Sequence, residues 1–262
     1  MVINRVAGGL LLALLLCAAP KAGALEVEGY PGSIWGGLSY DDDTRNGANS
    51  AGMGFVNQGI QWLTIPTNAH LVTYAEYRRR ARTYKPEYFD TGGPVVGAEL
   101  RWEYLTLGAD YYWEHLVGAT SNRVQYYGTV YYTWTLANGL GWAEALPGAV
   151  WAQATYDNDP YSGSGFMAFV NQGIQWVTLP GNIPFITYVE YRHRTRSVNQ
   201  GYYDTKGPAA GFEFRKSYFT LGADYYWMRE LDGPQNNTTW AANSHWQVYI
   251  AFFMSWDLKP GS

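Results

Sequence analysis

The chain has 262 residues, a formal net charge of −4 and a single cysteine, Cys17. Mild acidity of this kind gives no argument for a nucleic-acid partner. Because Cys17 falls in an apolar N-terminal segment, the rest of the sequence has no disulfide, thiol nucleophile or cysteine metal site. The chain contains 23 Tyr and 12 Trp, while the mean hydropathy is only −0.27. Side chains that are apolar at one end and polar at the other are typical of a membrane–water interface.

The N-terminus has the pattern of a secretory signal. Met1–Arg5 is a short basic start, Val6–Ala19 is an apolar run that is short for a membrane span, and Ala22–Ala24 fits a cleavage site. We therefore predict a cleaved signal peptide over residues 1–24 and a mature chain over residues 25–262. A retained anchor helix is the alternative.

The mature chain contains an internal repeat. Phe55–Trp62 returns letter for letter as Phe169–Trp176, and Leu107–Trp113 returns letter for letter as Leu221–Trp227, both at an offset of 114. Weaker matches at other offsets extend the repeat, so its halves cover about residues 32–135 and 148–256. A period this long exceeds one supersecondary unit and indicates a duplicated half-domain.

Alternation with a period of two dominates the sequence after the signal, which predicts β-strands. From Tyr74 to Arg82, for example, alternate residues are polar or charged, and the charged ones return in the second copy. Each half holds six expected strands, near residues 33–40, 54–65, 71–83, 94–102, 105–115 and 123–134, and near 149–156, 166–178, 185–197, 208–216, 218–230 and 245–256.

The connections between these strands alternate in length. Polar loops such as Asp41–Gly47 and Asp232–Asn243 alternate with tight connections such as Pro66–Asn68 and Pro180–Asn182. Signal, alternation, aromatic residues and loop asymmetry together resemble bacterial outer-membrane β-barrels of the porin-like kind. The resemblance implies an all-β fold, a single antiparallel transmembrane β-barrel of about 12 strands in the outer membrane of a Gram-negative bacterium.

Two points qualify this interpretation. Such barrels usually end on an aromatic residue, whereas Trp256 is followed by Asp257–Ser262. The assembly machinery reads this terminal aromatic residue. Either the last strand differs from the one expected here, or the signal for assembly lies inside the chain. The alternative fold is a pair of soluble six-stranded units, which would bury the apolar face and expose the charged one.

If the apolar face meets lipid, the charged face lines the lumen. The expected lumen residues comprise eight arginines and six acids, 8 − 6 = +2, with two tyrosines: Arg78, Arg80, Arg82, Arg101, Arg192, Arg194, Arg196, Arg215, Glu76, Glu99, Asp110, Glu190, Glu213, Asp224, Tyr112 and Tyr226. Further tyrosines expected to narrow the bore, or to stack on sugar rings, are Tyr127, Tyr131 and Tyr249.

Hairpin geometry predicts partners for these charges. If the loop between the strands expected over 71–83 and 94–102 is centred near Tyr88–Phe89, Glu76 lies opposite Arg101 and Arg78 lies opposite Glu99. A two-residue turn at Glu103–Tyr104 would add Asp110 opposite Gly97, so that Gly97 lies between Arg80 and Asp110. In the second copy the corresponding residues are Arg194, Asp224 and Gly211. Two interpretations follow. The charges neutralise one another and hold the wall together, or Arg82 and Arg196, which receive no partner in this scheme, form a track for anions.

The function predicted from these residues is an outer-membrane pore or export conduit for an anionic or saccharide solute. The alternative is a non-conducting barrel that acts as a surface receptor or as a structural partner of an envelope assembly. Expected partners are outer-membrane lipid, lipopolysaccharide and the barrel assembly machinery, with no nucleic acid.

Catalysis and cofactors are not expected. Nucleophilic catalysis needs a serine and a histidine aimed at one point, and the adjacent Ser244 and His245 would point to opposite faces of a strand. We therefore predict no enzyme activity, no cofactor and no metal. The acidic loops Asp41–Asp43 and Asp157–Asp159 could take calcium, although solvated loop tips are the simpler interpretation.

Overall fold

The protein is an all-β structure of strands joined by turns and loops. The computed structural model describes residues 27–42, 49–66, 68–83, 90–116, 119–136, 141–157, 163–197, 205–230 and 244–260. Its strands are β1 (Tyr30–Asp41), β2 (Asn49–Ile65), β3 (Ala69–Arg82), β4 (Thr91–Arg101), β5 (Leu105–Leu116), β6 (Ala119–Leu136), β7 (Leu146–Asp157), β8 (Ser164–Leu179), β9 (Ile183–Arg196), β10 (Thr205–Lys216), β11 (Phe219–Tyr226), β12 (Arg229–Glu230) and β13 (His245–Leu258).

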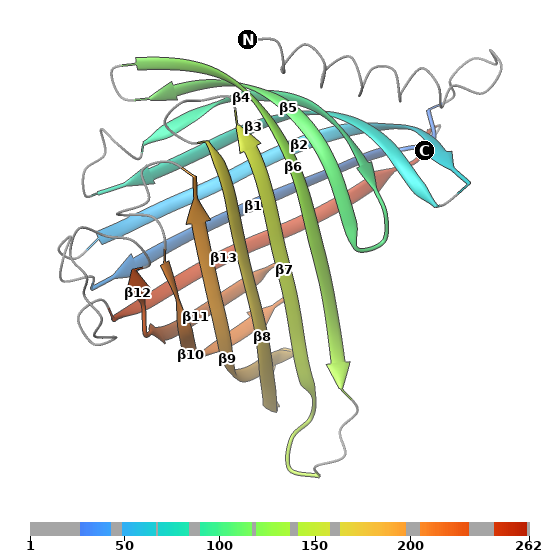
Figure 1. The fold of residues 1–262 in the computed structure, drawn as a ribbon. Coiled ribbons are helices and arrows are strands. Elements are labelled where there is room, and N and C mark those ends of the chain that lie inside the picture. The colour runs from blue at the N-terminus through green and yellow to red at the C-terminus, as the bar shows by residue number, and fades with distance from the viewer. Residues whose placement is uncertain are drawn as a thin grey trace.

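The strands form one closed antiparallel barrel (Figure 1). Each strand pairs with the next in sequence, except that β11 pairs with β13, and β13 closes the ring by pairing with β1. The short β12 pairs only with β10 and lies within the last part of the strand expected over 218–230. If β11 and β12 are counted as one strand, the barrel has 12 strands, and the predicted fold class is confirmed. A pair of separate six-stranded units is excluded, because β6 pairs with β7 along its length.

The outer face of the barrel is apolar on every side. Large hydrophobic side chains stand exposed at alternate positions of the strands; examples are Leu38, Val56, Tyr77, Val96, Leu107, Val130, Val170, Val189, Phe212, Leu221 and Ile250. Alternation places these residues on one surface and the charged residues on the other, because successive side chains of a strand point to opposite faces. An exterior of this kind suits contact with lipid.

Indole rings mark the outer surface near the short-turn end. Trp134 on β6 and Trp256 on β13 lie flat over Gly148 and Gly32, where a Cβ atom would come within 2.3 and 2.4 Å of the rings. Their indole nitrogens donate to Gln172 and Gln58 at 2.9 and 3.0 Å. Tryptophan in this position, apolar in body and hydrogen-bonded at its nitrogen, is typical of a membrane interface.

A β-bulge recurs at the same end of both halves. The register of β2 with β3 shifts between Gln61 and Leu63, and that of β8 with β9 shifts between Gln175 and Val177. The extra residues are Trp62 and Trp176, whose indole nitrogens each donate to a threonine hydroxyl at 2.8 Å. A bulge re-aims the side chains of its strand.

The turns that follow the bulges are also equivalent. Asn68 and Asn182 both have φ of 58°, in the left-handed region. Asparagine tolerates this conformation better than most residues. The backbone amide of Asn68 donates to the carbonyl of Ile65 at 2.9 Å, which closes the turn.

The predicted signal peptide over residues 1–24 lies outside the described residues. Among the residues that are described, none belongs to a helix long and apolar enough to cross a membrane. The boundary at residue 24 therefore stays a prediction.

Candidate functional site

The charged face of the strands is the concave, inner face of the barrel. Tyr74 on β3 and Tyr127 on β6 lie three strands apart in the sheet, yet their hydroxyl oxygens are 3.0 Å apart. Only the concave side of a closed sheet brings such side chains together. The pairing register shows which positions of each neighbouring strand share this inner face. All sixteen residues predicted to line the lumen occupy such inward positions. Their role in binding or conducting a solute stays a prediction.

Two equivalent ionic clusters form the polar walls of the lumen. In the first, Arg78 pairs with Glu76 and donates to Oδ2 of Asp110 at 2.8 Å. The side chain of Asp110 is fully buried and that of Glu76 is nearly so. A buried carboxylate needs this kind of compensation, because desolvation costs several kcal/mol per ion.

The second cluster repeats the first at the offset of 114. Arg192 pairs with Glu190 and donates to Oδ2 of Asp224 at 2.6 Å. Asp224 is again fully buried. Both copies thus keep the same arginine between the same two acids.

A tyrosine bridge extends each cluster across the wall. The Tyr74 hydroxyl contacts Oδ2 of Asp110 at 3.2 Å and the Tyr127 hydroxyl, which donates to Glu99 at 2.8 Å. The chain of contacts ends at Arg101, which pairs with Glu99. The second copy contains the same sequence of contacts, from Asp224 through Tyr188, Tyr249 and Glu213 to Arg215.

Glycines make room for these tyrosines. A Cβ atom on Gly97 would lie 2.6 Å from the Tyr74 ring, and one on Gly108 would lie 2.3 Å from the Tyr127 ring. The second copy has the same close approach, since a Cβ on Gly222 would lie 2.4 Å from Tyr249. The rings therefore lie flat against the sheet and reach over it to their partners.

The predicted partners across β3 and β4 are wrong. Glu76 faces Val95 rather than Arg101, a difference of 101 − 95 = 6 positions, and Arg78 faces Gly93 rather than Glu99. Alternation cannot detect an error of this kind, because a shift by an even number keeps every side chain on its face. The observed strand register is therefore not symmetric about Tyr88–Phe89, and these two residues lie outside the described ones.

The predicted bridge across Gly97 is wrong for the same reason. Gly97 does face Asp110, as expected, but its neighbour on β3 is Tyr74, and Arg80 lies opposite Thr91. Asp110 therefore receives Arg78. The second copy is corrected in the same way, because Tyr188 faces Gly211 and Asp224 receives Arg192, not Arg194.

The sequence contained a simpler signal for the ion pairs. Four Glu-x-Arg triplets occur on inward faces, and each forms a pair within its own strand: Glu76 with Arg78, Glu99 with Arg101, Glu190 with Arg192 and Glu213 with Arg215. Residues two apart in a strand share a face. These pairs could have been predicted without knowing the register.

Arg123 forms a further cluster that the sequence analysis missed. Its guanidinium donates to Asp157 at 2.9 Å and lies 3.3 Å from Glu114, and both acids are buried. Asp41 and Asp257 also take inward positions, opposite Gln247 and Pro31. Adding these five described residues to the predicted set changes the balance from 8 − 6 to 9 − 10, so the expected positive excess disappears.

Other predicted residues occupy places that differ from expectation. Tyr112 and Tyr226 are only 3% and 6% exposed, so they are packed into the wall and do not project into the bore. Arg78 and Arg123 lie over the Tyr112 ring, with guanidinium carbons 5.7 and 5.0 Å from its centroid. The expectation that Arg82 and Arg196 stand without partners is wrong, because both take part in interactions.

Two rows of aromatic rings separate the ionic clusters. Register places Phe253, Trp35 and Phe55 side by side on β13, β1 and β2. It also places Tyr131, Trp151 and Phe169 side by side on β6, β7 and β8. We call these the first and second aromatic rows. Tyr131 was predicted to face inward, whereas the other five rings were missed.

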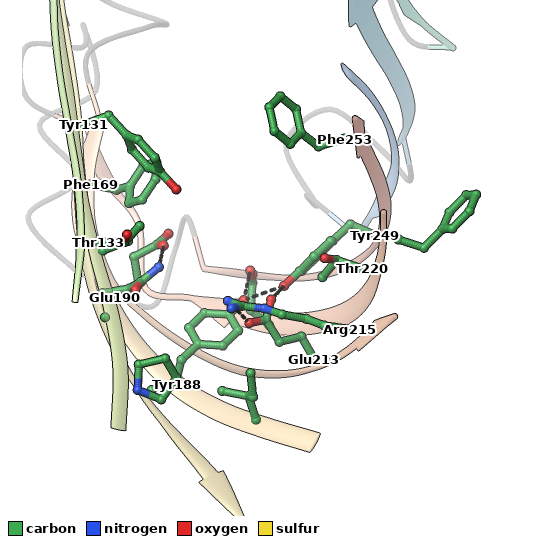
Figure 2. A pocket seen from close by; sticks show the side chains of 18 of the residues that line it. Tyr131, Thr133, Phe169, Tyr188, Glu190, Glu213, Arg215, Thr220, Tyr249 and Phe253 are labelled. Atoms are coloured by element: carbon green, nitrogen blue, oxygen red, sulfur yellow. Dashed lines mark hydrogen bonds and ion pairs between the residues drawn. The ribbon is translucent and has the colours of Figure 1, made fainter. Parts of the chain in front are cut away.

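A cavity of about 850 Å³ lies between the rows. Its lining includes rings of both rows together with residues of the second ionic cluster, among them Glu190, Arg192, Glu213, Arg215 and Tyr249. Figure 2 shows Tyr131 and Phe169 on one wall, Phe253 across from them, and Arg215 with Glu213 on the wall between. Tyr131 and Phe253 are each 53% exposed, so solvent reaches them inside the barrel.

The remaining candidates concern metal binding and catalysis. In the described part of the chain, His, Cys, Asp and Glu side chains form no group of three that could hold a metal ion. Asp43, Asp159 and their loops lie outside the described residues. The absence of catalysis stays a prediction.

Comparison with known proteins gives a likeness at the level of architecture. No protein-family model and no curated protein matches the chain. Similar solved structures include the β domain of the Bordetella autotransporter BrkA, with 10% identity over 87% of this chain and all of that one, at a TM-score of 0.43. An outer-membrane channel from Pseudomonas putida F1 has 10% identity over 90% of this chain and all of that one, at a TM-score of 0.42.

The KdgM porin, solved in complex with disordered oligogalacturonate, is a third. It has 9% identity over 84% of this chain and 98% of that one, at a TM-score of 0.38. At these identities and scores, the ligands of the neighbours do not transfer to this chain. The closed antiparallel barrel and its apolar exterior define the fold, a β-barrel of the transmembrane type. Its location in the outer membrane of a Gram-negative bacterium stays a prediction.

Proposed function

We propose that the barrel is an outer-membrane channel that passes a hydrophilic solute, anionic or saccharide, through its lumen. The observation that carries this proposal is the exposure of inward-facing side chains beside the cavity. Arg215 has a side chain that is 47% exposed although it sits on the concave face. A lumen filled by packed side chains would leave no cavity of about 850 Å³ beside this residue.

The charges of the wall support a channel with weak ion selectivity. The guanidinium groups that line the cavity, those of Arg192 and Arg215, are held by Glu190 and Glu213. Paired charges of opposite sign leave little net field in the bore, and net field is what gives a pore strong ion selectivity. The channel is therefore expected to show only weak preference between small anions and cations.

Single-channel recording in planar lipid bilayers tests the proposal. The expected result is discrete conductance steps with a reversal potential near zero in a salt gradient. Arg215→Gln removes one positive charge from the lumen and should move selectivity toward cations. Lys206→Gln is the matched control, because it removes the same charge from an outward position of the same strand, β10.

A barrel that inserts but shows no conductance would contradict the channel and favour the alternative, a receptor or structural partner. Equal effects of Arg215→Gln and Lys206→Gln would contradict the lumen as the conducting path. Folding of each variant is checked by heat-modifiable migration on a gel.

A further inference from the structure

We propose that the two aromatic rows bind the faces of pyranose rings, so that the solute of the channel is an oligosaccharide and not a small anion. This inference rests on the proposed function and names the solute class of the same lumen. It starts from the geometry of the rows.

The three rings of each row occupy directly opposite positions on three neighbouring strands. Trp35 pairs directly with Phe253 on one side and with Phe55 on the other. Neighbouring strands lie about 4.8 Å apart, so three adjacent rings cover about 10 Å, long enough for more than one linked sugar ring. The planes of Trp35 and Phe55 differ by 26°, and those of Trp151 and Phe169 by 19°. The rings of each pair are stacked, with centroids 6.1 and 5.9 Å apart, so aromatic surface continues from one strand to the next.

The rows are not part of the packed core. The buried apolar clusters of the described residues involve other side chains, Tyr74 with Val95 and Tyr112, and Ala209 with Tyr226 and Met228. Phe253 instead leaves 53% of its surface exposed in a polar lumen. An exposed apolar surface rimmed by polar groups marks a binding site.

The polar groups beside the rows suit hydroxyl groups better than a lone anion. Arg192 and Arg215 line the cavity with carboxylates already bound to them, so a phosphate or sulfate would meet acids as well as bases. A sugar hydroxyl both donates and accepts, and can therefore bond to the carboxylate and the guanidinium of one pair. The C–H face of the pyranose is apolar and fits the aromatic surface.

Both rows contribute to one cavity. Trp35 and Phe253 line it from the first row, and Tyr131 and Phe169 line it from the second. A linear oligosaccharide in the lumen would therefore pass between two aromatic walls, with ion pairs along its edges. Both uncharged and acidic sugars can bind in this way, because neither the aromatic rows nor the balanced ion pairs require a charged ligand.

The test uses cellohexaose, a galacturonic acid hexamer and inorganic phosphate as three probes of the whole purified barrel. Each is added to the channel in a bilayer, to measure interruption of the ion current, and to the barrel in detergent, to measure tryptophan fluorescence. We expect both hexasaccharides to interrupt the current and change the fluorescence, and phosphate to do neither.

Leucine variants locate the site. Phe169→Leu and Phe253→Leu each remove a ring from one row and should weaken hexasaccharide binding by about tenfold, as loss of a buried aromatic anchor does. Phe166→Leu and Phe252→Leu are matched controls on the same two strands at outward positions, and should leave binding unchanged.

The outcomes separate the two proposals. A channel that conducts but ignores both hexasaccharides refutes the saccharide site and leaves the channel standing. Binding in detergent by a barrel that never conducts refutes the channel and leaves the site standing. Current interruption by phosphate that survives both inward variants would point to a small anion and overturn the inference.

Discussion

The two halves of the barrel share a tyrosine-bridged ionic cluster but differ toward the loop end. In the first half, Glu114 and Arg123 occupy inward-facing positions near this end, whereas the equivalent residues of the second half are Met228 and His245. Arg123 holds two buried acids, while Met228 packs in an apolar cluster with Tyr226 and Ala209. One half thus fills the same space with an ion cluster and the other with apolar contacts.

The backbone differs at the same place. β5 and β6 stay paired as far as Leu116 and Ala119, whereas pairing of β11 with β13 stops at Tyr226 and His245. After this point the chain continues as β12, which pairs only with β10. A buried ion cluster must be kept or replaced as a set, because a single missing partner leaves a desolvated charge. The contrast is between a margin that differs in the two halves and a centre that is the same in both.

The largest expected effect is the loss of Arg123. Arg123→Met should lower the free energy of unfolding by about 3–5 kcal/mol, because it strips the cation from two buried acids. Urea unfolding in lipid vesicles measures the change. Adding Glu114→Met to it should recover part of the loss, since the pair would then resemble the second half. A single variant that unfolds like the wild type would show that the cluster is not energetically significant.

The centre of the module should respond equally in both halves. Asp110→Asn and Asp224→Asn should each cost about 2–3 kcal/mol, because the hydrogen bond from the arginine loses the negative charge of its acceptor. The new amide would also be poorly satisfied, since Oδ1 of each aspartate is buried without a hydrogen-bond partner among the described residues. Heat-modification midpoints provide the measurement. A loss confined to one half would break the equivalence of the two clusters.

The glycines beneath the tyrosines give a smaller effect. Gly108→Ala and Gly222→Ala should each cost about 1–2 kcal/mol, because the new methyl group pushes a tyrosine off the sheet. Gly128→Ala is the control on the outer face, where a Cβ would lie 3.2 Å from the flexible end of Leu107. Urea midpoints that rank Gly128→Ala as the most harmful of the three would refute the close packing of Tyr127 and Tyr249.

The smallest effect concerns two glutamates outside the strands. Hydrogen bonds from the Thr64 hydroxyl and from Gln61 lower the pKa of Glu28, and those from Thr178 and Gln175 lower the pKa of Glu144. A lowered folded-state pKa gives stability that is present at neutral pH and lost as pH falls through that pKa. A Glu28→Gln and Glu144→Gln double variant should melt slightly below wild type at pH ~7, and the gap should narrow as the pH falls below ~4. A gap that persists in acid would assign the effect to packing.

The sequence by itself determined the faces of the strands and their order around the wall. A period of two needs no knowledge of neighbours, because successive side chains of any strand point to opposite sides. The alternation therefore placed Arg78, Asp110 and Glu99 on the inner face, and the repeat located the second set. The Glu-x-Arg pairs were equally within reach, since each lies within one strand.

Only the tertiary structure decided which residues meet across strands. The register of β3 with β4 differs from expectation by an even number, to which alternation is blind. The contact of Tyr74 with Tyr127 depends on the curvature of a closed sheet, which brings β3 and β6 within reach of each other. The aromatic rows were hidden in the same way, because Trp35, Phe55 and Phe253 become neighbours only when β13 pairs with β1 and closes the barrel.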